Sequence, residues 1–151
     1  MATKHKFSES ILIAAPREEV FDFTQDYSKR LQWDTFLIRA RLLNATHAEV
    51  GVRAYCVARN RLGMETEYVS FHRPRVAAVK MTKGPFFFEQ FSASWKFVET
   101  TPESSTVTFL YSFSLRFPFS IFARMIKRNL RNNVRQRLRD LQRCFDLKDK
   151  S

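Results

Sequence analysis

The spacing of apolar residues changes its period once along this chain. Between residues 36 and 116 apolar and polar residues alternate, and turn signals such as Arg73-Pro74 separate the alternating runs. This pattern predicts about six antiparallel strands joined by hairpins, with one buried face. From about Pro118 to Asp146 the period becomes helical and glycine is absent, which predicts one long amphipathic helix. Its apolar stripe consists of Phe122, Ile126, Leu130, Val134, Leu138, Leu141 and Phe145.

The first 33 residues predict one further strand and two short helices. Residues 5–13 alternate weakly and read as a strand. Pro16 and the two glutamates that follow it favour a helix start, so a short helix is expected from Pro16 to Phe23. Ser28 is expected to cap a second short helix over residues 29–33.

A sheet with one apolar face needs a cover, and only the C-terminal helix is long enough to supply it. We therefore expect an α+β fold in one domain, residues 1–151. About seven antiparallel strands would curve around the long helix, with two short helices after the first strand. A strongly twisted sheet wrapped on a single helix leaves space near its open end. Concave, mostly apolar space of this kind is where small ligands bind.

Composition excludes several classes of function. Three glycines cannot supply a phosphate-binding loop, and no Gly-x-Ser-x-Gly or His-Glu-x-x-His motif is present. The two cysteines and three histidines lack metal-ligand spacing, so neither a metal nor a cofactor is expected. The polar N-terminus is unlike a signal peptide, and no segment approaches the ~20 apolar residues that span a bilayer. We therefore expect a cytoplasmic protein.

Several segments together indicate a family. They are Ile13–Phe23, Trp33-Asp34, the Arg73-Pro74 turn, Trp95–Phe97 before a loop, and the closing amphipathic helix. In this order and spacing the chain resembles the SRPBCC superfamily, also called START-like or helix-grip, and within it the polyketide cyclase/dehydrase group. The resemblance implies the helix-grip fold, with the ligand between the curved sheet and the last helix.

Members of that superfamily include aromatase/cyclases, lipid and sterol carriers, coenzyme Q-binding proteins and plant hormone receptors. The resemblance therefore implies that this chain binds a small hydrophobic ligand, such as a lipid, an isoprenoid or quinone, or an aromatic polyketide. The alternative is an enzyme, a metal-free cyclase/dehydratase that uses acid/base groups in the same cavity. A carrier would have an apolar cavity with no shifted pKa, whereas an enzyme would have a convergent polar set with a perturbed pKa.

Twelve residues are candidate ligand contacts, because they fall on the expected inner face of the sheet, on the helix stripe or near the cavity mouth. They are Trp33, Met64, Tyr68, Met81, Phe91, Trp95, Tyr111, Phe113, Ile126, Asn129, Asn133 and Arg137. Glu89 and His72 on the same strands are candidate proton-transfer groups, although no catalytic residue is assigned and whether these two side chains and Arg137 face the cavity stays open. The competing interpretation is a filled core with polar tips that reach water. A register slip of one residue would exchange the two faces.

Arginines recur on the opposite face of the predicted helix. They are Arg124, Arg128, Arg131, Arg135, Arg139 and Arg143. Arginine forks suit phosphate, so this face could dock on an anionic membrane, on RNA or on an acidic protein. Nucleic acid is the less favoured partner, because no aromatic residues are interleaved for base stacking. The alternative is a solvated helix face that keeps the protein soluble, and the oligomeric state stays open.

Overall fold

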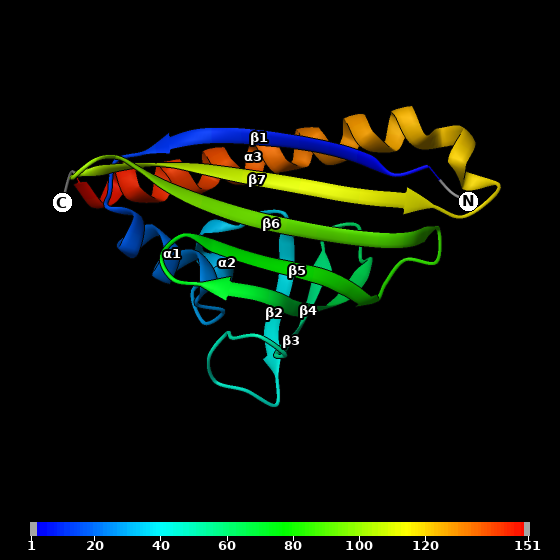
Figure 1. The fold of residues 1–151 in the computed structure, drawn as a ribbon, viewed down its shortest axis with the longest axis horizontal. Coiled ribbons are helices and arrows are strands. Elements are labelled where there is room, and N and C mark those ends of the chain that lie inside the picture. The colour runs from blue at the N-terminus through cyan, green and yellow to red at the C-terminus, as the bar shows by residue number, and fades with distance from the viewer. Residues whose placement is uncertain (1–2, 150–151) are drawn as a thin grey trace.

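Seven strands form one antiparallel sheet that curves around a long C-terminal helix (Figure 1). The computed structural model describes residues 3–149. Its elements are β1 (His5–Ile13), α1 (Arg17–Gln25), α2 (Arg30–Trp33), β2 (Leu37–Leu43), β3 (Arg53–Ala58), β4 (Gly63–His72), β5 (Val76–Lys83), β6 (Phe88–Thr101), β7 (Ser104–Leu115), the 3-10 turn η1 (Phe119–Phe122) and α3 (Ala123–Asp149).

The strand order is β1-β7-β6-β5-β4-β3-β2, so the first two strands lie at opposite edges of the sheet. The segment containing α1 and α2 connects these two edges, whereas strands β2 to β7 follow one another as neighbours. Figure 1 shows the resulting curvature, with β2 upright in the view while β1 and β7 lie horizontally. The helix α3 runs along β7 and contacts β1. The expected α+β helix-grip architecture is therefore confirmed.

One local prediction is wrong. Ser28 does not cap α2, whose N-cap is Lys29 and has no side-chain cap hydrogen bond. The Ser28 hydroxyl and its backbone N–H both donate to Asp26 Oδ1, at 2.6 and 3.0 Å. The Asp26 carboxylate thus closes a turn immediately before α2. The Ser28 side chain takes part in this turn and does not cap the helix.

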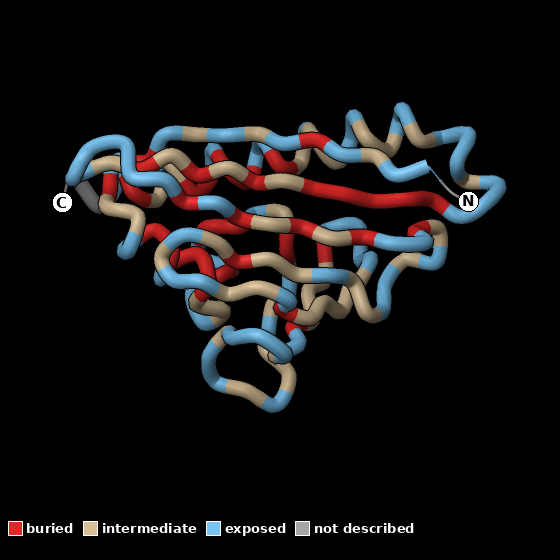
Figure 2. Tube along the Cα trace, in the orientation of Figure 1, coloured by how far each residue is buried: buried red, intermediate tan, exposed pale blue. Residues whose placement is uncertain are grey.

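The apolar stripe of α3 is buried along only half of its length (Figure 2). Val134 and Leu138 are 0% and 2% exposed, because they pack into the core with α1 and the sheet. Leu130 is only half-buried, and Phe122, at the start of the stripe, is 45% exposed. The apolar stripe is therefore packed in the core at the C-terminal end of α3, whereas its side chains at the N-terminal end are only partly covered.

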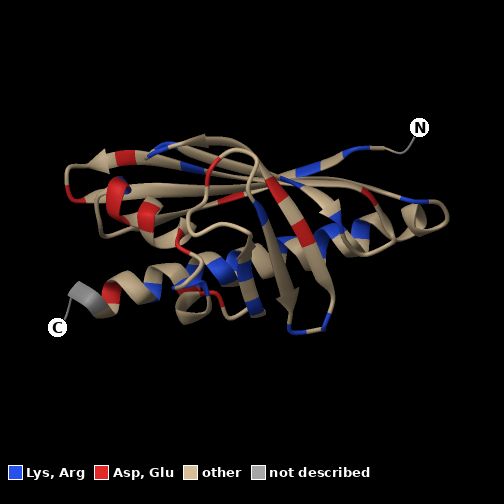
Figure 3. Ribbon diagram, turned by 90° about the horizontal axis from the view of Figure 1, so that it is seen from below, with Lys and Arg blue, Asp and Glu red and all other residues tan. Residues whose placement is uncertain are grey.

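Basic residues recur along α3, as the blue bands on the long helix in Figure 3 show. Two of the predicted surface arginines pair with Glu9 of β1: Arg131 Nε lies 3.3 Å and Arg135 Nε 3.0 Å from Glu9 Oε1. The remaining four are exposed and make no ion pair among the described residues: Arg124, Arg128, Arg139 and Arg143. Over residues 3–149, no helix is long and apolar enough to cross a membrane.

Candidate ligand-binding site

A cavity of about 520 Å³ lies between the sheet and the N-terminal half of α3. Its volume falls within the range of small-molecule binding sites. The strands β2 to β7 line it with inward-facing side chains, and α2, η1 and α3 complete the wall. Ile126 and Leu130 of the α3 stripe face this space, which explains why they are less buried than the later members of the stripe.

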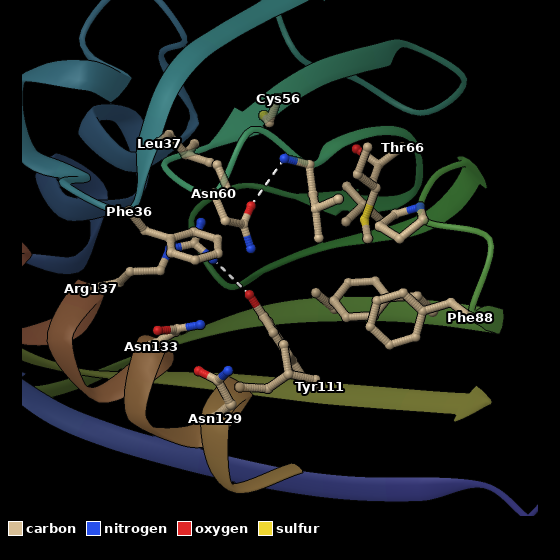
Figure 4. A pocket seen from close by; sticks show the side chains of 18 of the residues that line it. Phe36, Leu37, Cys56, Asn60, Thr66, Phe88, Tyr111, Asn129, Asn133 and Arg137 are labelled. Carbon is tan, nitrogen blue, oxygen red and sulfur yellow. Dashed lines mark hydrogen bonds between the residues drawn. The ribbon is translucent and has the colours of Figure 1, made fainter. Parts of the chain in front are cut away.

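The structure brings nine of the twelve candidate contacts to the cavity wall. They are Met64, Tyr68, Phe91, Trp95, Tyr111, Ile126, Asn129, Asn133 and Arg137. Figure 4 shows the asparagines and Arg137 reaching inward from neighbouring turns of α3, opposite Tyr111 on β7. The helical period places all four α3 residues on one side of the helix. Their role as ligand contacts remains a prediction.

The other three candidates lie outside the cavity wall. Trp33 is 1% exposed and packs edge-on behind Trp95, with ring centroids 6.0 Å apart. Phe113 lies towards the end of β7, where it is fully buried and packs against Phe88 and His5.

Met81 follows the inward-facing Val79 on β5 but does not line the cavity. Its thioether turns toward the β5–β6 connection and occupies the space where a side chain at Gly84 would otherwise sit. The glycine thus gives the methionine room to fold back onto the turn.

Two strand irregularities turn the candidate proton-transfer groups outward. The pairing of β6 with β7 shifts directly after Phe88, so Phe88 lines the cavity and Glu89 is exposed. The pairing of β4 with β5 shifts directly after Tyr68, and His72 at the strand end is exposed. Each bulge adds a residue and reverses the alternation beyond it. Neither Glu89 nor His72 faces the cavity.

A buried ionic cluster closes one end of the cavity. Asp34, which is 0% exposed, accepts hydrogen bonds from Arg30 Nε at 2.9 Å and from Arg137 Nη2 at 2.8 Å. Arg137 Nε also lies 3.1 Å from both carboxylate oxygens. Burial alone would raise the pKa of Asp34, but the charges of the two arginines outweigh it and lower the pKa. The carboxyl group is therefore ionised at neutral pH.

Buried hydroxyl groups surround this cluster. Arg137 Nη1 donates to the Tyr111 hydroxyl at 2.6 Å (Figure 4), and the Tyr68 hydroxyl donates to Gln25 Oε1 at 2.7 Å. Burial raises the pKa of Tyr111 and raises that of Tyr68 well above its ordinary value. Burial also raises the pKa of the Cys56 thiol. These groups are neutral at physiological pH and can donate hydrogen bonds, but they are not bases.

The described lining residues contain no carboxylate and no histidine. Over residues 3–149 there is also no group of three or more His, Cys, Asp or Glu side chains that could hold a metal ion. The wall therefore offers hydrogen-bond donors from guanidinium, phenol, amide and thiol groups and acceptors from the asparagine carbonyls, beside a large apolar surface. The cavity has the apolar character expected of a carrier, together with the shifted pKa values expected of an enzyme.

Sequence reasoning missed Arg30 and the role of Asp34. The spacing of four residues between them fits one helix turn and would have signalled a pair. Their partner Arg137 is 103 residues further along the chain from Asp34, and no local pattern reports such a contact. Arg137 itself was detectable, because a charged residue inside an apolar stripe must find a partner when it is buried.

Comparison with known proteins places this architecture in a family. Residues 4–145 match the sequence model described as polyketide cyclase / dehydrase and lipid transport. A START superfamily protein from Mycobacterium smegmatis superposes with a TM-score of 0.81 at 13% identity, covering 95% of this chain and 98% of its own. No curated protein matches the chain in sequence.

Two enzymes of known structure share the fold. The Zhui aromatase/cyclase from Streptomyces sp. R1128 gives a TM-score of 0.80 at 13% identity, covering 95% of this chain and 94% of its own. A norcoclaurine synthase from Thalictrum gives a TM-score of 0.73 at 9% identity, covering 100% of this chain and 99% of its own. At these identities the likeness concerns the fold alone.

Proposed function

We propose that this chain, which belongs to the polyketide cyclase/dehydrase and lipid transport family, binds a small hydrophobic molecule in the cavity between its sheet and α3. The observation that carries the proposal is the change in burial along α3. Its apolar stripe is continuous in sequence, yet only the C-terminal half is packed. Apolar side chains that line an open space gain free energy when an apolar ligand fills it, at about 25 cal/mol per Å² of buried surface.

The mouth of the cavity supports transfer of the ligand to or from a membrane. Met125, which lines the cavity, is 62% exposed. Three further apolar side chains lie within two positions of lining residues in the sequence and are strongly exposed: Phe117 by 89%, Ile121 by 74% and Phe86 by 71%. Exposed clusters of large apolar residues mark interaction sites on soluble proteins. Three exposed arginines accompany the cluster: Arg116, Arg124 and Arg128. Apolar residues that insert and arginines that contact phosphate together fit an anionic membrane surface.

This arrangement revises the docking hypothesis for the arginine face. The central arginines, Arg131 and Arg135, are held by Glu9, so the free positive charge lies towards the two ends of α3. The end with Arg124 and Arg128 is also the end where two exposed residues, Phe122 and Met125, line the cavity. In the proposed mode the protein would rest on this end and exchange its ligand directly with the bilayer.

A cyclase function is the second candidate, and the pair formed by Arg137 and Tyr111 favours it. A guanidinium and a neutral phenol 2.6 Å apart at a cavity wall could polarise a ligand carbonyl and stabilise an enolate. The described lining lacks a carboxylate or imidazole base, which an aldol cyclisation also needs. Binding without chemistry is therefore the better supported function. The cyclase function would become the better supported one if a linear β-triketone cyclised faster with the wild-type protein than in buffer. The Tyr111→Phe variant should then give no acceleration over buffer.

The test of binding is a titration of full-length protein with 1-pyrenebutanol, a neutral apolar probe whose emission band ratio reports local polarity. The proposal predicts saturable binding of one equivalent, with an emission ratio typical of an apolar environment. Absence of saturable binding both of this probe and of an acidic probe with the same pyrene body would refute it. Mass spectrometry of the organic extract of freshly purified protein would then identify the class of any ligand that co-purifies.

A further inference from the structure

The buried cluster at the closed end of the cavity does not balance its charge. Arg30 and Arg137 are each 5% exposed and share a single carboxylate, that of Asp34. The other buried carboxylate nearby, Asp140, accepts hydrogen bonds from Thr35 and from Gln136 and pairs with neither arginine. The surrounding tyrosines are neutral. Two guanidinium groups and one carboxylate leave one positive charge in excess.

The excess charge is available from the cavity side. Arg30 lines the cavity, and within residues 3–149 the only hydrogen-bond acceptor of its guanidinium group is Asp34, bonded through Nε. A guanidinium carries five N–H donors, so both amino groups of Arg30 keep theirs. The rings of Trp33, Tyr27 and Trp95 surround the guanidinium at 5.0 to 5.7 Å from its carbon. They support the cation through their faces but cannot neutralise it.

Filling the cavity changes the surroundings of this charge. An apolar ligand expels the solvent that would otherwise hydrate Arg30, and an unpaired charge in an apolar environment is strongly disfavoured. Binding of a ligand with a neutral head would therefore cost the hydration free energy of Arg30. A ligand with one negative charge at its inner end would instead complete two ion pairs, one for each arginine.

We propose that the ligand is an amphiphilic carboxylic acid, bound with its carboxylate at Arg30 and its apolar body directed toward the mouth. The inference rests on the proposed binding function and specifies its ligand class. A carboxylate matches the guanidinium fork in shape, and its single charge equals the excess. The Tyr111 hydroxyl accepts from Arg137, which leaves its own hydrogen free to donate to the second carboxylate oxygen. The aromatic rings around Arg30 favour a small planar head over a bulkier phosphate.

The test compares two probes that share one apolar body, 1-pyrenebutanoic acid and 1-pyrenebutanol, near neutral pH. The wild-type protein is expected to bind the acid at least about tenfold more tightly, the scale of one buried charge-assisted hydrogen bond. Arg30→Met removes the excess charge while keeping an apolar stem, and should bring the two affinities together. Arg139→Gln removes one exposed positive charge from the other face of α3 and should preserve the preference. It therefore controls for general attraction to a basic protein.

Each outcome decides one of the two proposals. Equal affinity of the wild-type protein for both probes overturns the carboxylate assignment and leaves hydrophobic binding standing. A preference that persists in Arg30→Met, or is lost in Arg139→Gln, also overturns the assignment. If neither probe binds the wild-type protein, the proposed binding function itself fails. The wild-type comparison decides the question even if Arg30→Met does not fold.

Discussion

Two leucines on α3 allow the cavity to be tested through stability alone. Leu138 is 2% exposed and packs in the filled core, whereas Leu130, two turns earlier on the same apolar stripe, is half-buried and lines the cavity. Truncation to alanine removes the same atoms from the same helix in both cases. Helix propensity and the unfolded state therefore change equally, and the difference reports how each side chain is packed.

The expected losses follow from these surroundings. Truncating Leu138 loses about 2.4 kcal/mol of transfer free energy, at ~0.8 kcal/mol for each of three buried carbon groups. The closed void left behind raises the total to about 3–4 kcal/mol. Leu130→Ala creates no closed void, because its side chain already borders open space. Partial burial reduces its transfer loss as well, so about 1 kcal/mol is expected.

Urea unfolding followed by circular dichroism measures both free energies. A difference of about 2 kcal/mol corresponds to midpoints separated by about 1 M urea, given a slope of about 2 kcal/mol per M for a small protein. Equal losses for the two variants would refute the reasoning. They would mean that the N-terminal half of α3 packs as tightly as the C-terminal half and that the cavity is filled.

Three further predictions concern the ionic cluster and the mouth. Asp34→Asn leaves two buried arginines without a carboxylate and should lower the free energy of unfolding by about 3–5 kcal/mol in the same urea assay. Because the pKa of Asp34 is lowered in the folded protein, its contribution to stability is complete above the ordinary carboxyl range. It should be lost as the pH falls through the folded value, and unfolding curves of Asp34→Asn should lack this acid-dependent component. The double change Phe117→Ser with Ile121→Ser should lower the affinity for phosphatidylserine-containing vesicles, measured by co-sedimentation, at least about tenfold. Leu12→Ser, which alters an exposed apolar residue of β1, should leave it unchanged; equal effects of the two changes would exclude docking at the mouth.

The sequence predicted the architecture because the fold depends on periodicity. Alternation from residue 36 to 116 and the helical stripe after Pro118 each concern neighbouring residues, and burial of their apolar faces leaves one arrangement. The same argument placed Tyr111 and Ile126 on the inner face, and both residues line the cavity. These residues lie where the period runs without interruption.

Side-chain orientation could not be predicted where the period is interrupted. The bulges after Tyr68 and Phe88 reverse the faces of β4 and β6, and no residue in either segment announces the extra position. For this reason the sequence left the orientation of Glu89 and His72 open, and the structure exposes both side chains. Arg30 was not predicted for a different reason. It is buried in a cluster with Asp34, which also binds Arg137 from a distant part of the chain. Charged clusters assembled by tertiary contacts leave no periodic signal.

The central claim is that the space beside α3 receives a ligand, and two adjacent asparagines test it most directly. Asn133 lines the cavity, and Asn132 is exposed and does not. A tryptophan at either position adds the same bulk to the same turn of helix. The affinity for 1-pyrenebutanol, measured by titration, should fall at least about tenfold in Asn133→Trp, since the added ring occupies ligand space. It should be unchanged in Asn132→Trp. Equal affinities of the two variants would contradict the account, because the probe would then be binding somewhere other than the cavity.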